Sequence, residues 1–148
     1  KITADDLPFI IADVLESGDY QHVELVDCVI NSRLSGQSIA TVDAKIDDML
    51  FSEQGRGNGG FDAFTDAIRK ILVHREVELP ELLDYQVHIP KGGHTNALTE
   101  AIISWQLPNG TRATTRGVHA NQVFAAIEAT SRVINRLLHE KINEKLHE

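Results

Sequence analysis

Residues 55–61 read Gly-Arg-Gly-Asn-Gly-Gly-Phe and stand between two segments of opposite periodicity. Residues 48–53 before them predict a strand, and in residues 62–72 apolar side chains recur at helical spacing. Glycines at this density favour a sharp turn between the two elements. A looser echo, Thr-Arg-Gly-Val at 115–118, precedes a second predicted helix. The chain is therefore predicted to contain two versions of one strand-to-helix unit.

The first half of the chain predicts a βββα unit. Three runs rich in Val, Ile and Thr predict antiparallel strands, at residues 23–33, 40–46 and 48–53. Turn-forming pairs, Ser35-Gly36 and Asp47-Asp48, separate these runs. The helix at 62–72 completes the unit.

The second half repeats this order. It predicts strands at 82–89, 98–106 and 111–116 and a helix at 121–139, with a Pro-Asn-Gly turn at 108–110. Three matches carry the repeat: Leu25-Val26-Asp27 with Leu82-Leu83-Asp84, Ala44-Lys45-Ile46 with Ile103-Ser104-Trp105, and Arg56-Gly57 with Arg116-Gly117. The offset grows from 57 (27 to 84) to 60 (56 to 116), as small loop insertions would produce.

The predicted fold class is α+β: a two-layer arrangement of internally duplicated βββα units preceded by a short helix. A three-stranded meander has one apolar face that a helix can cover, so we expect the strands to pool into one longer sheet. Acidic residues after Thr3 predict a leading helix at 4–16, with a hinge at Gly18 and Asp19. We expect residues 1–18 to be a linker helix from a missing upstream region and residues 19–148 to be one domain, with repeats at 22–75 and 80–139.

Composition argues against several classes of protein. The 148 residues carry a formal charge of −8 without a basic stripe, which argues against nucleic acid as a partner. The lone Cys28 forms no disulfide framework, which fits a cytoplasmic protein. No apolar run approaches the roughly 20 residues that span a bilayer, so no membrane partner is expected. The chain reads as an excised piece of a larger protein.

The glycine segment formally satisfies G-x-G-x-x-G, the dinucleotide fingerprint. That fingerprint requires a crossover to a parallel strand, and the flanking pattern here is an antiparallel meander. Two interpretations stay open. The glycines either permit a tight turn with positive φ, or they leave bare amides at a helix N-terminus that accept a carboxylate or small anion.

Other side chains give no catalytic or metal pattern. The seven histidines never form H-x-H or H-E-x-x-H, and His88 and His94 flank a glycine loop, so no metal is predicted. Cys28 lies within a strand and is expected to be buried and inert. Apolar residues follow the first helix in the next strand, either as core or as a place for a ligand's apolar tail. They are Leu82, Tyr85, Val87 and Ile89.

Several segments together resemble the C-terminal allosteric (dimerisation) domain of 2-isopropylmalate synthases, which citramalate synthases share. They are residues 57–64, Leu83-Asp84-Tyr85, residues 93–98, Arg116-Gly117 and residues 125–129, and the resemblance covers about residues 23–138. It implies a regulatory module that forms a homodimer and is not itself an enzyme. The parent's acetyl-CoA-dependent acyl transfer would belong to an upstream metal-dependent barrel, while this domain needs no cofactor.

The resemblance also implies an effector site. The family's glycine turn falls on Gly57, Asn58, Gly59 and Gly60, where Gly60 replaces the usual proline, and its apolar pocket falls on Phe61, Leu82, Tyr85, Ile89 and Ala97. The amides of 58–60 would hold the effector's carboxylate, and Asp62 or Asp84 its ammonium. Leucine is the expected effector because isopropylmalate synthases are the commoner bearers of the domain.

Three alternatives remain. Isoleucine replaces leucine if the parent is a citramalate synthase. A dimerisation scaffold without a ligand, or a free-standing small enzyme, would have the same fold without the effector site. Of the two strand-to-helix corners, only the first carries Asn58-Gly59-Gly60, so it and not the echo at Gly117 is expected to hold the carboxylate.

Overall fold

The computed structural model describes residues 21–89 and 98–146. The predicted leading helix, the hinge at Gly18 and Asp19, His94 and Ala97 lie outside these residues. The chain divides into two compact units, a first unit at His22–Leu79 and a second unit that includes Pro80–Glu148.

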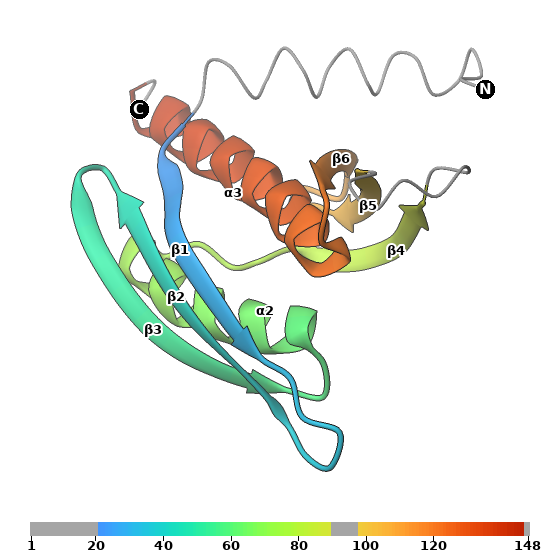
Figure 1. Ribbon diagram of the computed structural model, residues 1–148. Helices are drawn as coiled ribbons and strands as arrows, with labels where there is room; N and C mark the ends of the chain where they lie inside the picture. The colour runs from blue at the N-terminus through green and yellow to red at the C-terminus, as the bar shows by residue number, and fades with distance from the viewer. Residues whose placement is uncertain (1–20, 90–97, 147–148) are drawn as a thin grey trace. The chain divides into compact units, whose positions relative to one another are not determined.

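The first unit is a three-stranded antiparallel sheet with a helix on one face (Figure 1). Its elements are β1 (Val23–Asn31), β2 (Ser38–Ile46), β3 (Met49–Gly57), α2 (Gly60–Leu72) and the 3₁₀ turn η1 (Val73–Arg75). Buried side chains alternate along β2, as the strand period requires, and face the apolar stripe of α2. The predicted βββα unit is confirmed.

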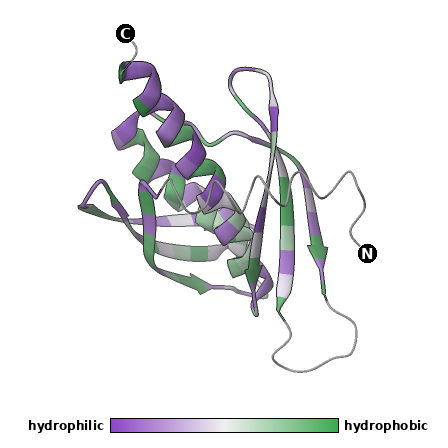
Figure 2. Cartoon of the chain, turned by 90° about the horizontal axis from the view of Figure 1, so that it is seen from above, coloured by the Kyte–Doolittle hydropathy of each residue, from purple (hydrophilic) through white to green (hydrophobic). Residues whose placement is uncertain are grey.

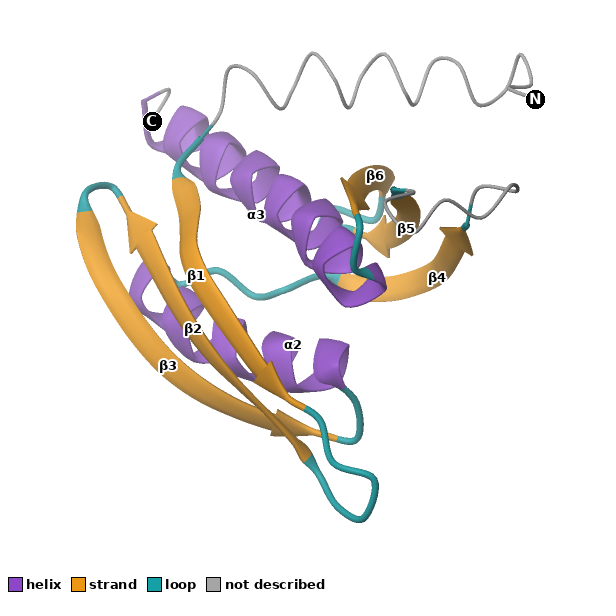
Figure 3. Cartoon of the chain, in the orientation of Figure 1, coloured by secondary structure: helices purple, strands orange, loops and turns teal. Residues whose placement is uncertain are grey.

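The second unit has the same plan. Its elements are β4 (Glu81–His88), β5 (Thr99–Gln106), β6 (Arg112–His119) and α3 (Gln122–Leu146). In both units the strand order follows the chain, and the helix packs mainly on the second and third strands. Figure 3 shows the repeated order of three strands and a helix, and Figure 2 shows hydrophobic and hydrophilic bands side by side on the helices. The predicted duplication is confirmed.

The six described strands do not pool into one sheet, which corrects our expectation. Every strand pairing joins neighbours in the chain, β1-β2-β3 in one sheet and β4-β5-β6 in the other. The β2–β3 and β5–β6 connections are short hairpins, and each helix packs on its own three-stranded sheet. One of these hairpins is the predicted turn at Asp47 and Asp48, whose φ angles of 50° and 68° are those of a two-residue hairpin turn.

Strand β3 continues to Gly57, four residues beyond its predicted end at 53. The first glycines therefore belong to the strand, and among the described glycines only Gly110 has a positive φ. A Cβ on Gly55 would overlap the backbone of Ala63 and Ala67 in α2. Glycine is needed at position 55 because the helix lies against the strand there. The interpretation that these glycines permit a turn with positive φ is wrong.

The same contact recurs in the second unit and corrects the predicted repeat alignment. A Cβ on Gly117 would overlap Ala125 and Ala129 of α3. Gly117 lies opposite Ala101 in the sheet, as Gly55 lies opposite Ala40. Gly117 is thus the counterpart of Gly55, at an offset of 62, and not of Gly57.

The first strands keep the predicted offset of 57. Each carries a register shift at the same place, between Leu25 and Asp27 in β1 and between Leu82 and Asp84 in β4. The offset at β2 and β5 is 61, as Ala40 and Ala101 show, so Trp105 is the counterpart of Ala44. The extra residues of the second unit therefore lie between the strands and not within them.

Candidate functional site

The first strand-to-helix corner consists of Gly57, Asn58, Gly59 and Gly60, and it is formed within the first unit alone. Gly57 ends β3, Gly59 is the N-cap of α2, and Gly60 is the first residue of the helix. The Gly59 carbonyl accepts a hydrogen bond from the Ala63 amide at 3.0 Å, which begins the helical pattern. The helix direction therefore aims the first-turn amides out of this corner.

No side chain caps α2. Gly59 has extended backbone angles, φ −144° and ψ 174°, which any residue adopts, and a Cβ there would meet nothing within 4 Å. These are the conditions in which Ser, Thr, Asp or Asn is preferred as an N-cap. The fold alone thus gives no reason for glycine at position 59.

The second corner is the counterpart and is capped. The Asn121 side chain accepts hydrogen bonds from the amides of Val123, at 2.8 Å, and Phe124, at 3.2 Å. Asn121 lies 62 residues after Gly59, the offset of the two packing glycines. In the second unit the helix N-terminus is therefore occupied by the chain's own side chain, whereas α2 has no side-chain cap.

Two further groups stand beside the first corner. Asp62 lies in the first turn of α2, where its Cβ is close to Gly57. The Phe61 ring packs on the buried Phe64, with centroids 6.3 Å apart, and stays partly exposed. Amide donors, a carboxylate and an aromatic surface therefore come from six consecutive residues.

The other predicted site residues lie in the second unit. Leu82, Asp84 and Tyr85 belong to β4, and Ile89 follows that strand with 68% of its surface exposed. The Asp84 carboxylate accepts a hydrogen bond from the Gln86 side chain at 3.0 Å. These residues stay predicted members of the site, and the corner in the first unit is the part whose geometry is described.

Two weak acids occupy equivalent positions on the first strands, Cys28 in β1 and Tyr85 in β4. Burial, with a smaller contribution from the Asp27 carboxylate, raises the pKa of the Cys28 thiol to about 11. Burial also raises the pKa of Tyr85. Both groups are therefore protonated at neutral pH, and Cys28 is a poor nucleophile there.

Within the described residues, no three His, Cys, Asp or Glu side chains gather where they could hold a metal ion. No helix in that part of the chain is long and apolar enough to cross a membrane. Two carboxylates of the first unit have partners within that unit. Asp43 accepts a hydrogen bond from Ser52 at 2.6 Å, and Asp47 pairs with Arg75 at 3.2 Å.

The model of one protein family, the LeuA allosteric (dimerisation) domain, matches residues 1–138. The chain belongs to this family. The resemblance found in the sequence is thereby confirmed, and the domain is a regulatory and dimerisation module of the family that includes citramalate and 2-isopropylmalate synthases.

Individual relatives come from two synthase types. A protein named as an (R)-citramalate synthase from Archaeoglobus fulgidus is 31% identical over 93% of this chain, and a namesake from Methanosarcina acetivorans is 31% identical over 95%. A 2-isopropylmalate synthase from Methylorubrum populi is 29% identical over 90%. The matched region spans 24% to 28% of these relatives' own lengths, so the chain corresponds to about a quarter of each.

Proposed function

We propose that this LeuA-type domain is the feedback sensor of an acyl-transferring synthase and binds a branched-chain amino acid at the first corner. One observation carries the proposal: Gly59 leaves the N-terminus of α2 without a side-chain cap, although a capping residue would fit there. The counterpart Asn121 caps the equivalent corner of the second unit, so a corner of this kind can be capped by a side chain. A carboxylate from a ligand would supply the missing acceptor.

The neighbouring Asp62 favours a zwitterion over a simple anion. An acid beside the amides repels a bare anion, whereas an α-amino acid offers a carboxylate to the amides and an ammonium to the acid. Phe61 adds partly exposed apolar surface for an aliphatic side chain.

Isoleucine is the effector that we favour, in place of the leucine expected from the frequency of isopropylmalate synthases. Two of the three relatives described above are named as citramalate synthases, whose end-product effector is isoleucine by the resemblance. Leucine is the competing effector because a 2-isopropylmalate synthase is also among the relatives. The two isomers differ in one methyl position, which an apolar pocket separates by about 1 to 3 kcal/mol.

The synthase reaction is proposed to belong to another part of the parent protein. The relatives are about four times as long as the matched region, which leaves room for the metal-dependent catalytic barrel implied by the resemblance. Effector binding would inhibit that region only by favouring one of two arrangements of the protein. This chain alone should therefore release no free CoA thiol from acetyl-CoA and a 2-oxo acid, and a measurable release would contradict the proposal.

The domain is proposed to form a homodimer, as the family's name implies. The first strands expose apolar side chains that a partner copy could cover. They are Val26 and Val29 on β1 and Leu82 and Leu83 on β4. Sedimentation equilibrium should give twice the chain mass, and Val26→Lys or Leu83→Lys should shift the protein toward monomer; a wild-type monomer at high micromolar concentration would contradict the proposal.

Calorimetry and thermal unfolding with isoleucine, leucine, valine and lysine test the effector proposal. At about 100 times its dissociation constant, a bound effector should add roughly 2.7 kcal/mol to the free energy of unfolding. Isoleucine should bind most tightly and lysine least. No heat and no shift with any of the four at millimolar concentration would sink the proposal.

A matched pair of variants locates the site. Gly59→Asn gives the first corner the cap that Asn121 provides in the second, and should weaken effector binding by about tenfold or more because the amides are then occupied. The control Asn121→Gly opens the second corner and should leave the affinity unchanged. Equal affinity in wild type and Gly59→Asn would place the effector elsewhere.

A further inference from the structure

In each unit, one acidic and one basic side chain of the helix form hydrogen bonds with the backbone of the third strand, which is an edge strand of the sheet. In the first unit, the Arg56 amide donates to the Asp66 carboxylate at 3.0 Å. The Lys70 ammonium donates to the Gln54 carbonyl at 2.7 Å and lies 3.7 Å from Asp66. We call Asp66 and Lys70 the first clasp.

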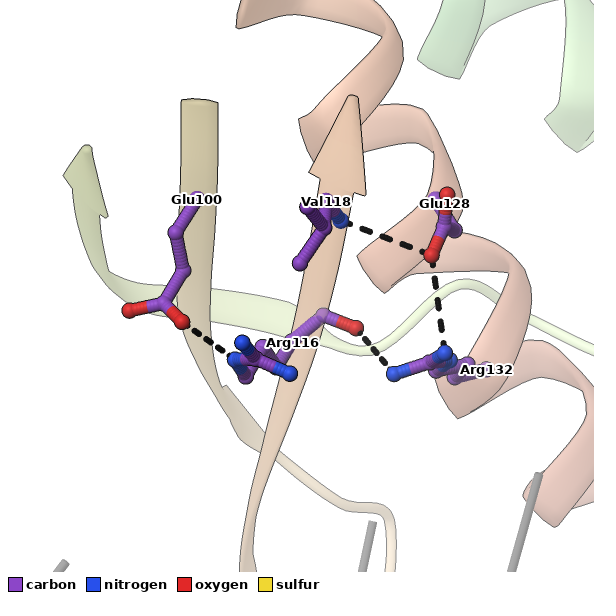
Figure 4. A network of polar contacts seen from close by, with 5 residues as sticks. All are labelled: Glu100, Arg116, Val118, Glu128 and Arg132. Carbon is purple, nitrogen blue, oxygen red and sulfur yellow. Dashed lines mark hydrogen bonds and ion pairs between the residues drawn. The ribbon is translucent and has the colours of Figure 1, made fainter. Parts of the chain in front are cut away.

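The second unit has the same arrangement, shown in Figure 4. The Val118 amide donates to Glu128 at 3.4 Å, and the Arg132 guanidinium donates to the Arg116 carbonyl at 2.6 Å. Arg132 also lies 3.5 Å from Glu128, and Arg116 pairs with Glu100. Glu128 and Arg132, 62 residues after the first clasp, form the second clasp.

The position of the clasps explains their backbone partners. Strands β3 and β6 are each one of the two edge strands of their sheet, so among the described residues one side of each has no neighbouring strand. The clasp supplies partners for an amide and a carbonyl on that side. In this role the two clasps are equivalent.

The chain after each outer strand differs between the units. In the second, the Asn121 amide donates to the His119 ring at 2.9 Å, and that ring packs edge-on against Phe124 with centroids 5.3 Å apart. The counterparts of His119 and Asn121 are Gly57 and Gly59, which have no side chains for such contacts. Glycine also has the largest backbone freedom to lose on ordering.

We propose that Asp66 and Lys70 are positioning residues that hold the first corner in its binding geometry. Asp66 lies in the helix that begins at Gly60 and accepts a hydrogen bond from the amide of Arg56, the residue before Gly57. The clasp therefore joins the strand before the glycine segment to the helix after it. Glu128 and Arg132 do not have this role, because the second corner is held by its own side chains. The ligand at the corner rests on the proposed function, whereas the ordering of the corner does not.

Hydrogen exchange tests the ordering without a ligand. In Asp66→Ala, exchange of the Ala63 amide, which is bonded to the Gly59 carbonyl, should rise by about three- to tenfold, as expected for losing one hydrogen bond. In Glu128→Ala, exchange of the Ala125 amide, which is bonded to the Asn121 carbonyl, should change less than twofold. Unchanged exchange at Ala63 in Asp66→Ala, or an equal rise at Ala125 in Glu128→Ala, would overturn the inference.

Effector affinity gives the second readout. Asp66→Ala should weaken isoleucine or leucine binding by about three- to tenfold, while Glu128→Ala should stay within twofold of wild type. Asp66→Asn keeps an oxygen that can accept from Arg56 and should recover most of the affinity. Lys70→Ala, which removes the bond to the Gln54 carbonyl, replaces Asp66→Ala if that variant does not fold. Equal weakening by Glu128→Ala would show a general stability effect and overturn the positioning role. If wild type binds none of the amino acids, the proposed function fails and hydrogen exchange alone decides the inference.

Discussion

The two strand-to-helix corners, residues 57–60 and 119–122, share a plan and differ where the backbone is exposed. The shared part is the packing of Gly55 or Gly117 against two alanines of the following helix. The difference is the N-cap, Gly59 in one corner and Asn121 in the other. At Gly55 and Gly117 a Cβ would overlap the helix backbone, and both units have glycine there. The N-cap position is open to a Cβ at Gly59, so the fold does not require glycine there.

The cores of the two units differ in a second way. The first unit buries Phe64 on its helix and the small Ala44 on its central strand. In the second unit the sizes are exchanged, because Ala126 is the counterpart of Phe64 and Trp105 that of Ala44. The Trp105 indole donates to the Thr115 hydroxyl at 2.9 Å, which satisfies its buried N–H. Comparable core volume is thus filled from opposite layers.

The largest predicted effect breaks these cores. Phe64→Ala and Trp105→Ala should each lower the free energy of unfolding by about 3 to 5 kcal/mol, because both side chains are fully buried and leave a cavity. Denaturant unfolding of each variant measures the loss. Leu50→Ala, at a position 64% exposed, is the control and should change it by less than about 0.5 kcal/mol. A loss under about 1.5 kcal/mol in either core variant would contradict the compensating-core account.

The next effect concerns the shared contact. Gly55→Ala and Gly117→Ala should each cost about 1 to 3 kcal/mol of unfolding free energy, since the new Cβ forces the helix away from the strand. The control is Gly36→Ala, whose Cβ would lie 3.9 Å from its nearest neighbour. Denaturant unfolding of the three variants, with the same slope of free energy against denaturant concentration, compares their midpoints. Loss in only one of the two units would show that the contacts are not equivalent.

Exchanging the caps gives a smaller effect on stability. Gly59→Asn should gain and Asn121→Gly should lose a few tenths of a kcal/mol, about the difference between these residues as N-caps. Thermal unfolding of the two variants, without effector, should therefore move in opposite directions. Destabilisation by Gly59→Asn would mean that the first corner cannot accept the geometry of the second.

The smallest effect at neutral pH comes from Cys28. Its folded pKa of about 11 lies above the ordinary value of 9.0, so folding favours the protonated thiol. This contribution is fully present below pH 9 and is lost as pH rises from 9 to 11, so stability should fall across that window. Iodoacetamide labelling should be half-maximal near pH 11 in the native chain and near pH 9 in urea. A native midpoint near pH 9, or Cys28→Ala keeping the whole alkaline loss, would contradict the assignment.

The sequence predicted the order of elements well because periodicity and turn chemistry are local. The alternation in residues 40–46 and the Asp47-Asp48 pair each specify a structure without reference to the rest of the chain. Glycine is different, since the residue type does not say why it is needed. Both a turn and a close helix contact favour glycine. For this reason the predicted third strand ended too early, and Gly117 was matched with Gly57 instead of Gly55.

The candidate site divides in the same way. Its glycine corner was found from local composition and from the resemblance, and the structure confirmed that Gly59 caps the helix without a side-chain bond. The clasp residues Asp66 and Lys70 were not identified from the sequence, which placed them only within the predicted helix at 62–72. Their partners, Arg56 and Gln54, are 10 and 16 residues away, and no spacing rule indicates backbone contacts across a strand and a helix.

By itself, the sequence determined two βββα repeats, their family and the corner that has no side-chain cap. Each of these depends on which side chains follow one another along the chain. Only the tertiary structure decided that the sheets stay separate, that Gly55 and Gly117 are counterparts, and that an acid and a base grip each outer strand. These features depend on contacts between residues that are distant in the chain. Neither the helix that packs against a glycine nor the side chain that binds an edge-strand amide can be read from the order of the residues.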